Sequence, residues 1–185
     1  VAERVPMAQI WAWQRDGAGE TDYDCVRLQL DETGHVMTPI DGHSVVAPED
    51  QAEWSLPVVS GIDLGKLKTL APGRPAGLPK LRAALGLIGE FRRSPLAGTV
   101  DLRVIDLSQP RILRVTTGDG GQVDLSTERL SRQFNRWARI RAHGQKFGLA
   151  IETVDLSVTN NVPVRWMLSP SIAEDMKRGR KVARK

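Results

Sequence analysis

The stretch VDLSVTNNVPVRW, residues 154–166, decides how the end of the chain folds. Apolar and branched residues fill its two halves, and Asn160 and Asn161 lie between them. Because asparagine tolerates the positive φ of a tight hairpin turn, the pattern predicts two antiparallel strands joined there. Pro163 has no N–H to donate to a neighbouring strand, so residues 162–167 are expected at a sheet edge or at a bulge.

Upstream of this hairpin, short apolar runs bounded by glycine, proline or aspartate predict further strands. They cover residues 8–13, 23–30, 36–37, 56–61, 100–107, 110–116, 122–125 and 149–158. A change of face between Cys25 and Val26 predicts a bulge in the second of these strands. The sequence GDGG at 118–121 lacks the Lys and Ser/Thr of a phosphate loop, so it predicts a hairpin turn.

Residues 78–93 have the spacing of a one-sided helix. The apolar side chains that recur every three or four positions are Leu81, Ala84, Leu85, Ile88 and Phe91.

A second helix is predicted to begin near Ser126 or Thr127, either of which can cap it, with Glu128 in its first turn. Its expected inner stripe is Leu130, Phe134, Trp137 and either Ala138 or Arg141. Gly144 is expected to break this helix before the last two strands begin.

The order of elements is strands, a helix, three strands, a helix and two strands. Most of the connections between strands are short, which favours antiparallel pairing, and each helix has one apolar stripe to bury. The sequence therefore predicts the α+β class: a largely antiparallel β-sheet with two helices packed on one face.

The net charge of +4 comes mainly from the end of the chain. Residues 177–185, KRGRKVARK, contain six of the 26 Lys and Arg, which leaves 20 against 22 Asp and Glu in the rest. A near-neutral body argues against a nucleic-acid-binding face across the whole domain. Two cationic features stay open, as solvated surface or as contacts for an anionic partner or lipid surface. They are this tail and the helical stripe Arg129, Arg132, Arg136 and Arg139.

No group of residues has the pattern of a catalytic or metal site. The single cysteine, Cys25, excludes an intrachain disulfide and a CxxC pair. The three histidines are far apart in the sequence; they are His35, His43 and His143. Asp22 and Asp24 lie in a turn, where aspartate is common for local reasons. We therefore expect no enzyme activity, no cofactor and no metal. A hydrolase would show converging titratable groups, and the sequence offers no candidates for them.

Five motifs then follow one another in an order that resembles the FtsQ/DivIB family of bacterial cell-division proteins. They are VAERVPMAQIW (1–11), LDETGHVM (30–37), LPVVSG (56–61), DLSTERLSRQFNRW (124–137) and VDLSVTNNVPVRW (154–166). The resemblance runs from Val1 to about Trp166 and therefore covers nearly all of the expected folded part.

The resemblance implies a domain organisation. In that family a cytoplasmic tail and one transmembrane helix precede a POTRA domain and a β-domain, both outside the cytoplasmic membrane. Residues 1–14 would then be the last strand of the POTRA domain, 15–168 the β-domain and 169–185 a basic C-terminal tail. The chain has no apolar run of about 20 residues, so we expect it to be a fragment. The expected location is the inner membrane, with the folded part periplasmic.

The resemblance also implies a function. FtsQ/DivIB proteins are non-enzymatic divisome scaffolds that bind FtsB and FtsL, and through them act on the septal wall synthase FtsW and FtsI. A segment of FtsB adds as an extra strand to the last strands of the β-domain, a mode of binding that uses main-chain hydrogen bonds. The implied partner-binding residues are Val158, Asn160, Asn161, Val162, Val164, Arg165 and Trp166.

Trp166 is the expected anchor of this interface, because a tryptophan on an edge strand supplies a large apolar contact. A core or rim position is the alternative for this side chain. The chain departs from the family at Val158, where a Tyr is common, at Asn160–Asn161, where the turn is of Ser-Gly type, and at Ser157, where an Arg is common. The alternative function is a module that binds nucleic acid or an anionic surface through the basic tail and the arginine stripe.

Overall fold

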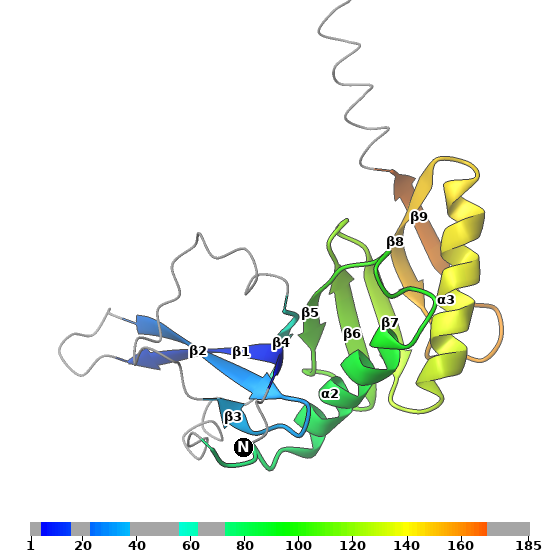
Figure 1. Cartoon of the computed structure of the whole chain (residues 1–185). Helices are drawn as coiled ribbons and strands as arrows, with labels where there is room; N and C mark the ends of the chain where they lie inside the picture. Colours follow the sequence, from blue (N-terminus) through cyan, green and yellow to red (C-terminus); the bar gives the residue numbers. More distant parts are fainter. Residues whose placement is uncertain (1–4, 16–22, 38–55, 63–72, 170–185) are drawn as a thin grey trace, which may run out of the picture.

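The structure, a computed structural model, describes residues 5–15, 23–37, 56–62 and 73–169 (Figure 1). In these residues it contains two helices, α2 (Pro79–Arg92) and α3 (Leu130–Gln145). The strands are β1 (Pro6–Arg15), β2 (Tyr23–Asp31), β3 (Val36–Met37), β4 (Val58–Ser60), β5 (Leu102–Asp106), β6 (Ile112–Thr117), β7 (Gln122–Ser126), β8 (Leu149–Asp155) and β9 (Val164–Leu168). Residues 16–22 and 38–55, which connect predicted strands, and all but the first residue of the predicted tail 169–185 lie outside the described residues.

The strands form one nine-stranded sheet in the order β3-β2-β1-β4-β5-β6-β7-β8-β9. Five of its eight pairings in the described residues are antiparallel. The other three, β1–β4, β4–β5 and β7–β8, are parallel. A parallel neighbour needs a long crossover connection, and α2 and α3 supply two of these crossovers, between β4 and β5 and between β7 and β8. The predicted α+β fold with a largely antiparallel sheet is confirmed.

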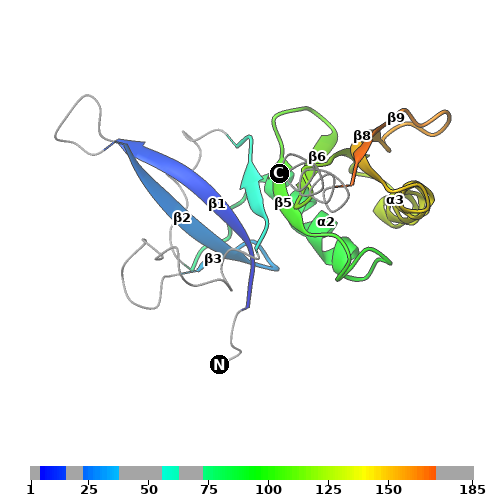
Figure 2. The same ribbon diagram turned by 90° about the horizontal axis from the view of Figure 1, so that it is seen from above.

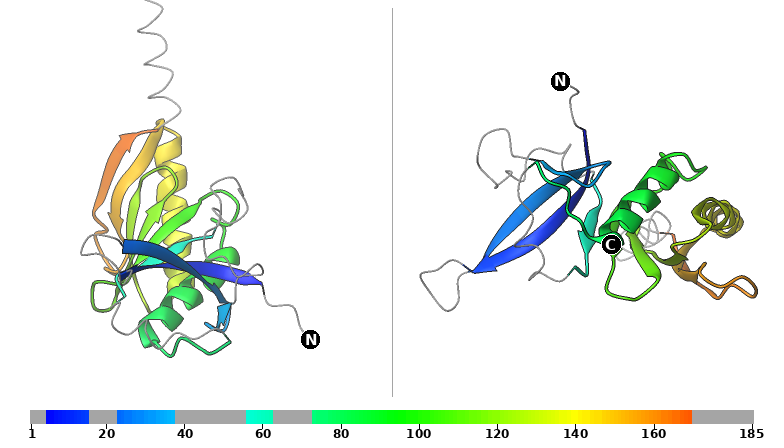
Figure 3. Two further views of the ribbon diagram at one scale, coloured as in Figure 1. Left: turned by 90° about the vertical axis from the view of Figure 1, so that its left-hand side faces the viewer. Right: turned by 90° about the horizontal axis from the view of Figure 1, so that it is seen from below.

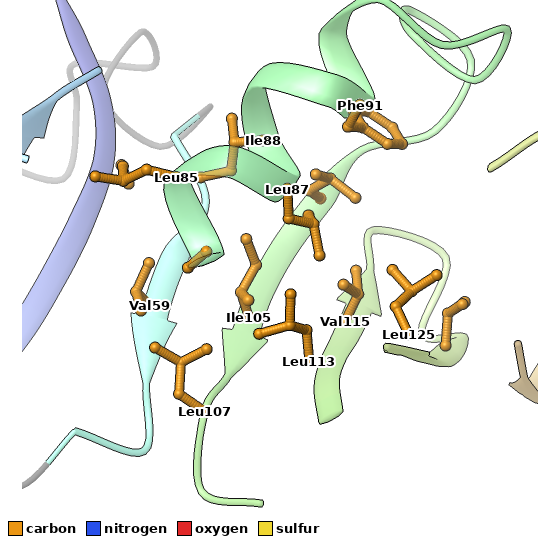
Figure 4. Packing of buried hydrophobic residues seen from close by; sticks show 14 of the residues in the cluster. Val59, Leu85, Leu87, Ile88, Phe91, Ile105, Leu107, Leu113, Val115 and Leu125 are labelled. Atoms are coloured by element: carbon orange, nitrogen blue, oxygen red, sulfur yellow. The ribbon is translucent and has the colours of Figure 1, made fainter. Parts of the chain in front are cut away.

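One face of the sheet packs against the helices and forms the core (Figure 4). The predicted stripe of α2 is buried in full, and Leu87 joins it. In α3, Phe134 and Trp137 are buried. The two helices meet through Phe91 and Phe134, whose ring centroids are 5.6 Å apart in an edge-to-face arrangement. Both helices therefore cover the same face, as the sequence predicts.

A polar bridge reinforces the contact between the helices. The Glu90 carboxylate accepts a hydrogen bond of 2.8 Å from Ser131 Oγ and one of 2.6 Å from the Arg93 guanidinium. The bond from Ser131, followed by the bond and the charge of Arg93, lowers the pKa of Glu90.

The start of α3 differs from the prediction. Neither Ser126 nor Thr127 caps the helix, since Ser126 is the last residue of β7 and the N-cap is Arg129, with a left-handed φ of 53°. The buried Gln133 replaces the cap: its Oε1 accepts from Ser126 N at 2.9 Å and its Nε2 donates to Ser126 Oγ at 2.9 Å. This amide ties the end of β7 to the first turn of the helix.

The predicted bulge in β2 is also absent. Cys25 and Val26 pair in regular register with Trp13 and Ala12. The irregularity lies at the other end of the hairpin, between Pro6 and Ala8, where proline cannot donate to the ladder.

β1 belongs to the same sheet as the rest of the described chain. It pairs with β2 and β4, and its residues Met7, Ala8 and Ile10 are buried. The assignment of residues 1–14 to a POTRA domain stays a prediction. The sheet is strongly twisted, so that β1 and β2 run in a clearly different direction from β8 and β9 (Figure 2). Its two outermost strands are β3 and β9.

Candidate functional site

The chain covers the β3 end of the sheet with its own backbone. Val36 N donates to Arg74 O at 3.2 Å, Gly73 N donates to Val36 O at 2.9 Å, and His35 forms an isolated bridge with Pro75. We call residues 73–75 the strap. The strap occupies the edge where another strand would otherwise pair.

The β9 end has no such cover within the part of the chain that the structure describes (Figure 3). Pro163 O accepts from Asp155 N at 3.3 Å, and Ser169 N donates to Gly148 O at 3.0 Å, so both groups point toward β8. Because backbone groups alternate between the two sides of a strand, the N–H and C=O of Val164, Trp166 and Leu168 point away from β8. These three residues form an open edge. Pro163 leaves this edge complete, because its missing N–H is on the β8 side.

Trp166 lies on the helix face of the sheet, opposite Ile151. Its half-buried indole packs against Gly144 so closely that a Cβ at that position would collide with the ring and lie 3.0 Å from Leu149 O. Gly144 is itself buried within α3, which ends one residue later at Gln145, so the predicted end of the helix is displaced by one residue. The glycine is needed for close packing of Trp166, and the tryptophan occupies a rim position between core and solvent.

The opposite face of the sheet carries charged side chains. The cross-strand register aligns Asp106, Arg114, Asp124 and Asp155 in one row across β5 to β8. Arg114 donates to both oxygens of Asp124, at 2.8 and 2.9 Å, and this carboxylate raises the pKa of Arg114. Exposed Arg165 of β9 lies on the same face, opposite Thr153. The open edge therefore separates an apolar face from a polar one.

The connection between β8 and β9 is longer than the predicted tight turn, because β8 ends at Asp155 and β9 begins at Val164. Asp155 Oδ1 accepts from the N and Oγ of Ser157, at 2.9 and 2.6 Å, and turns the chain out of the strand. Asn161 has the predicted positive φ, 48°. The loop 156–163 follows.

Arg136 of α3 fixes this loop. Its guanidinium donates to Val158 O at 2.8 Å and to Thr159 O at 2.5 Å. Arg136 is therefore half-buried and engaged, whereas the sequence predicts it on the outer face of the helix. Arg129, Arg132 and Arg139 are exposed, as predicted. A side chain from the helix thus supplies hydrogen bonds that a tight turn would make within itself.

A groove of about 720 Å³ lies between this loop and the N-terminal end of α3. Four arginines line it: Arg111, Arg129, Arg132 and Arg136. In the described residues, the guanidinium groups of the first three form no hydrogen bond or ion pair. Arg111 and Arg129 also have left-handed φ values, 64° and 53°, which are uncommon for non-glycine residues. We call this the arginine groove.

The predicted partner-binding residues lie along this end of the molecule. Val164, Arg165 and Trp166 are in β9, and Val164 and Trp166 are two of the three open-edge residues. The other four are in the loop: Val158 and Val162, half-buried, and Asn160 and Asn161, exposed. Their role as a binding site stays a prediction.

Sequence reasoning missed several residues of this region. Leu168 belongs to the open edge but lies beyond the motif, Gly144 supports Trp166, and Arg136 holds the loop. Gly144 and Arg136 make these contacts with residues distant in the sequence, which no local pattern reports. A proline at 163 was the one local signal for an edge, and it led to the correct strand.

Comparison with known families decides the relationship. Residues 23–157 match the family model described as Cell division protein FtsQ/DivIB, C-terminal. The chain belongs to the FtsQ/DivIB family. The predicted resemblance is thereby confirmed, and membership of this family implies a role as a scaffold in cell division. The search of curated proteins found no match.

The match to the FtsQ/DivIB model ends at Ser157 and so stops short of β9. Neither α2 nor α3, the two helices in the described ranges, is long and apolar enough to cross a membrane. Across the same ranges, no group of three or more His, Cys, Asp or Glu residues is placed to hold a metal ion.

Proposed function

We propose that this FtsQ/DivIB chain is the extracytoplasmic part of a bitopic inner-membrane protein that binds FtsB- and FtsL-type partners by strand addition to β9. Through them it links FtsW and FtsI to septal peptidoglycan synthesis. In this proposal residues 1–14 end a POTRA domain and 15–168 form the β-domain. The observation that carries it is the open edge of Val164, Trp166 and Leu168 at a sheet whose other edge is covered.

Strand addition suits this edge for physical reasons. Each of the three residues offers one N–H and one C=O, and a net contribution of about 1 kcal/mol per backbone hydrogen bond gives useful affinity without sequence specificity. Side chains then supply the specificity. Trp166 on the helix face favours an apolar neighbour, and exposed Arg165 on the other face favours a carboxylate.

The arginine groove supports an acidic partner segment beside the added strand. Three of its guanidinium groups, which are unpaired within the described ranges, lie next to the loop 156–163, which leads directly into β9. Hydrogen bonds between guanidinium and carboxylate groups are charge-assisted and often bidentate. A partner whose strand is flanked by Asp or Glu would therefore engage both features at once.

The test measures binding of the purified extracytoplasmic segment of FtsB from the same organism. Val164→Pro removes an N–H that points outward, so it should abolish binding while leaving pairing with β8 intact. Trp166→Ala should weaken binding about tenfold or more, as expected for a buried aromatic anchor. Circular dichroism and thermal unfolding confirm that each variant is folded. Equal binding by the wild type and both folded variants would refute the assignment of this edge.

The same groove favours the second candidate, a module that binds a nucleic acid or an anionic surface. Binding through phosphate contacts would weaken steeply with salt. A labelled single-stranded oligonucleotide, titrated from low to physiological salt, distinguishes the two. Tight, salt-dependent binding that is lost in an Arg129→Ala/Arg132→Ala variant would favour the second candidate.

A further inference from the structure

Within the described residues, two large exposed hydrophobic side chains belong to segments beside the open edge. Three large hydrophobic side chains are exposed in the described ranges: Val5 at 69%, Phe147 at 66% and Leu168 at 52%. Val5 precedes β1, whereas the other two belong to segments whose backbones are neighbours, since Phe147 follows α3 and Leu168 ends β9. The hydrogen bond from Ser169 N to Gly148 O joins the two segments.

Leu168 could contact an added strand through both its backbone and its side chain. It pairs with Leu149 and, two residues after Trp166, lies on the helix face of the sheet. Its backbone belongs to the open edge. A residue of an added strand opposite Leu168 would place its Cβ about 5 Å away on the same face. An apolar residue at that position would remove both side chains from water.

The exposed Phe147 ring packs against one side chain of α3. Phe147 N donates to Gly144 O at 2.9 Å, and the ring packs edge-to-face on His143 with centroids 5.2 Å apart. A side chain that is already ordered loses little conformational entropy on binding. An exposed aromatic in a fixed position is typical of a residue that anchors a partner.

We propose that Phe147 and Leu168 form a second, apolar anchor of the partner-binding surface, which we call the distal anchor. The segment added to β9 carries a large apolar side chain opposite Leu168, and this side chain also covers Phe147. The inference rests on the proposed strand addition and extends its footprint beyond Trp166, to the end of β9.

Charge favours a different protein over a second copy of this chain as the occupant. Lys146, which precedes Phe147, is exposed. Two copies joined here would bring their Lys146 side chains together, and like charges across an interface are unfavourable. A partner strand with one large apolar residue between acidic residues complements the surface.

The experiment compares Phe147→Ser and Leu168→Thr with Val5→Ser, the matched control at the remaining exposed hydrophobic residue. Threonine at 168 keeps a side chain suited to a strand. The dissociation constant for the purified extracytoplasmic FtsB segment is measured by titration calorimetry. We expect each distal-anchor variant to raise it about tenfold, from the apolar area no longer buried. Val5→Ser should leave it unchanged.

Val164→Pro separates the possible outcomes. If it abolishes binding while Phe147→Ser and Leu168→Thr bind like the wild type, the distal anchor is refuted and strand addition stands. If Val164→Pro itself binds normally, strand addition fails and the distal anchor falls with it. Sedimentation of the chain alone gives a further check, because a concentration-dependent dimer lost in Phe147→Ser would show that the surface joins two copies, which overturns the proposal.

Discussion

The two ends of the sheet differ in what pairs with the outermost strand. At β3 the strap 73–75 pairs with Val36 from the outside, while at β9 the groups of Val164, Trp166 and Leu168 face outward without a partner in the described chain. An uncovered edge is a liability, because any extended chain can pair with it, and proteins normally cover or disrupt it. In this chain one edge is covered by the strap, and the other edge is supported by α3, whose Gly144 packs against Trp166 of β9. This contrast supports the proposal that a partner strand binds at the β9 edge.

Among substitutions that test the packing of α3 against β9, we expect the largest loss of stability at Gly144. We expect Gly144→Ala to lower the free energy of unfolding by about 1–3 kcal/mol, because the added methyl group overlaps the Trp166 indole. Urea unfolding followed by tryptophan fluorescence measures the loss. The double variant Gly144→Ala/Trp166→Ala should lose less free energy of unfolding than the sum of the losses in the two single variants. Strict additivity would show that the two residues do not interact.

Arg136→Ala tests the support of the loop at the other end of β9. Loss of the two hydrogen bonds to Val158 O and Thr159 O should cost about 1.5 kcal/mol, since bonds to a charged group are stronger than neutral ones. Hydrogen exchange should speed up in residues 157–160, and partner binding should weaken because the loop is no longer fixed. Arg139→Ala is the matched control on the same helix. Similar exchange in both variants would contradict the assignment.

A single substitution in the strap that covers β3 should lower the stability of the protein less than the substitutions near β9. Gly73 has a φ of 75° and open space around it, so Gly73→Ala should cost about 1 kcal/mol through backbone strain alone. Hydrogen exchange at Val36 should then speed up, because the strap loosens. Gly86→Ala, in α2 and also in open space, should act in the opposite direction and stabilise the protein by up to about 1 kcal/mol. The same sign for both variants would refute this account.

Local patterns predicted the parts of the fold that local physics determines. The stripe of α2 follows directly from apolar spacing, since one side of the helix must be buried. Pro163 led to the correct edge strand, although it lies just before β9 and its missing N–H is on the β8 side. Asn161 took the predicted positive φ. Family motifs added the identity of the domain.

Contacts between distant residues decided the rest. The tight turn expected at Asn160 and Asn161 is a long loop, because Arg136 from α3 holds its carbonyl groups. Gly144, expected to end the helix, lies one residue before its end and leaves space above its backbone for Trp166. The strap over β3 is held by isolated backbone bonds, which leave no signature in the side-chain pattern. Parallel pairing followed from the crossover helices and not from the strands.

From β4 to β9 the sheet grows in the order of the chain, each strand lying beside its predecessor. During synthesis the outermost strand is therefore always the newest one, and the edge that remains at the end is the last to be made. A chain cut before Val164 would present β8 instead, with the Glu152 bulge and without Trp166. Under the proposed strand addition, a partner would therefore bind only a chain that has been synthesised through β9.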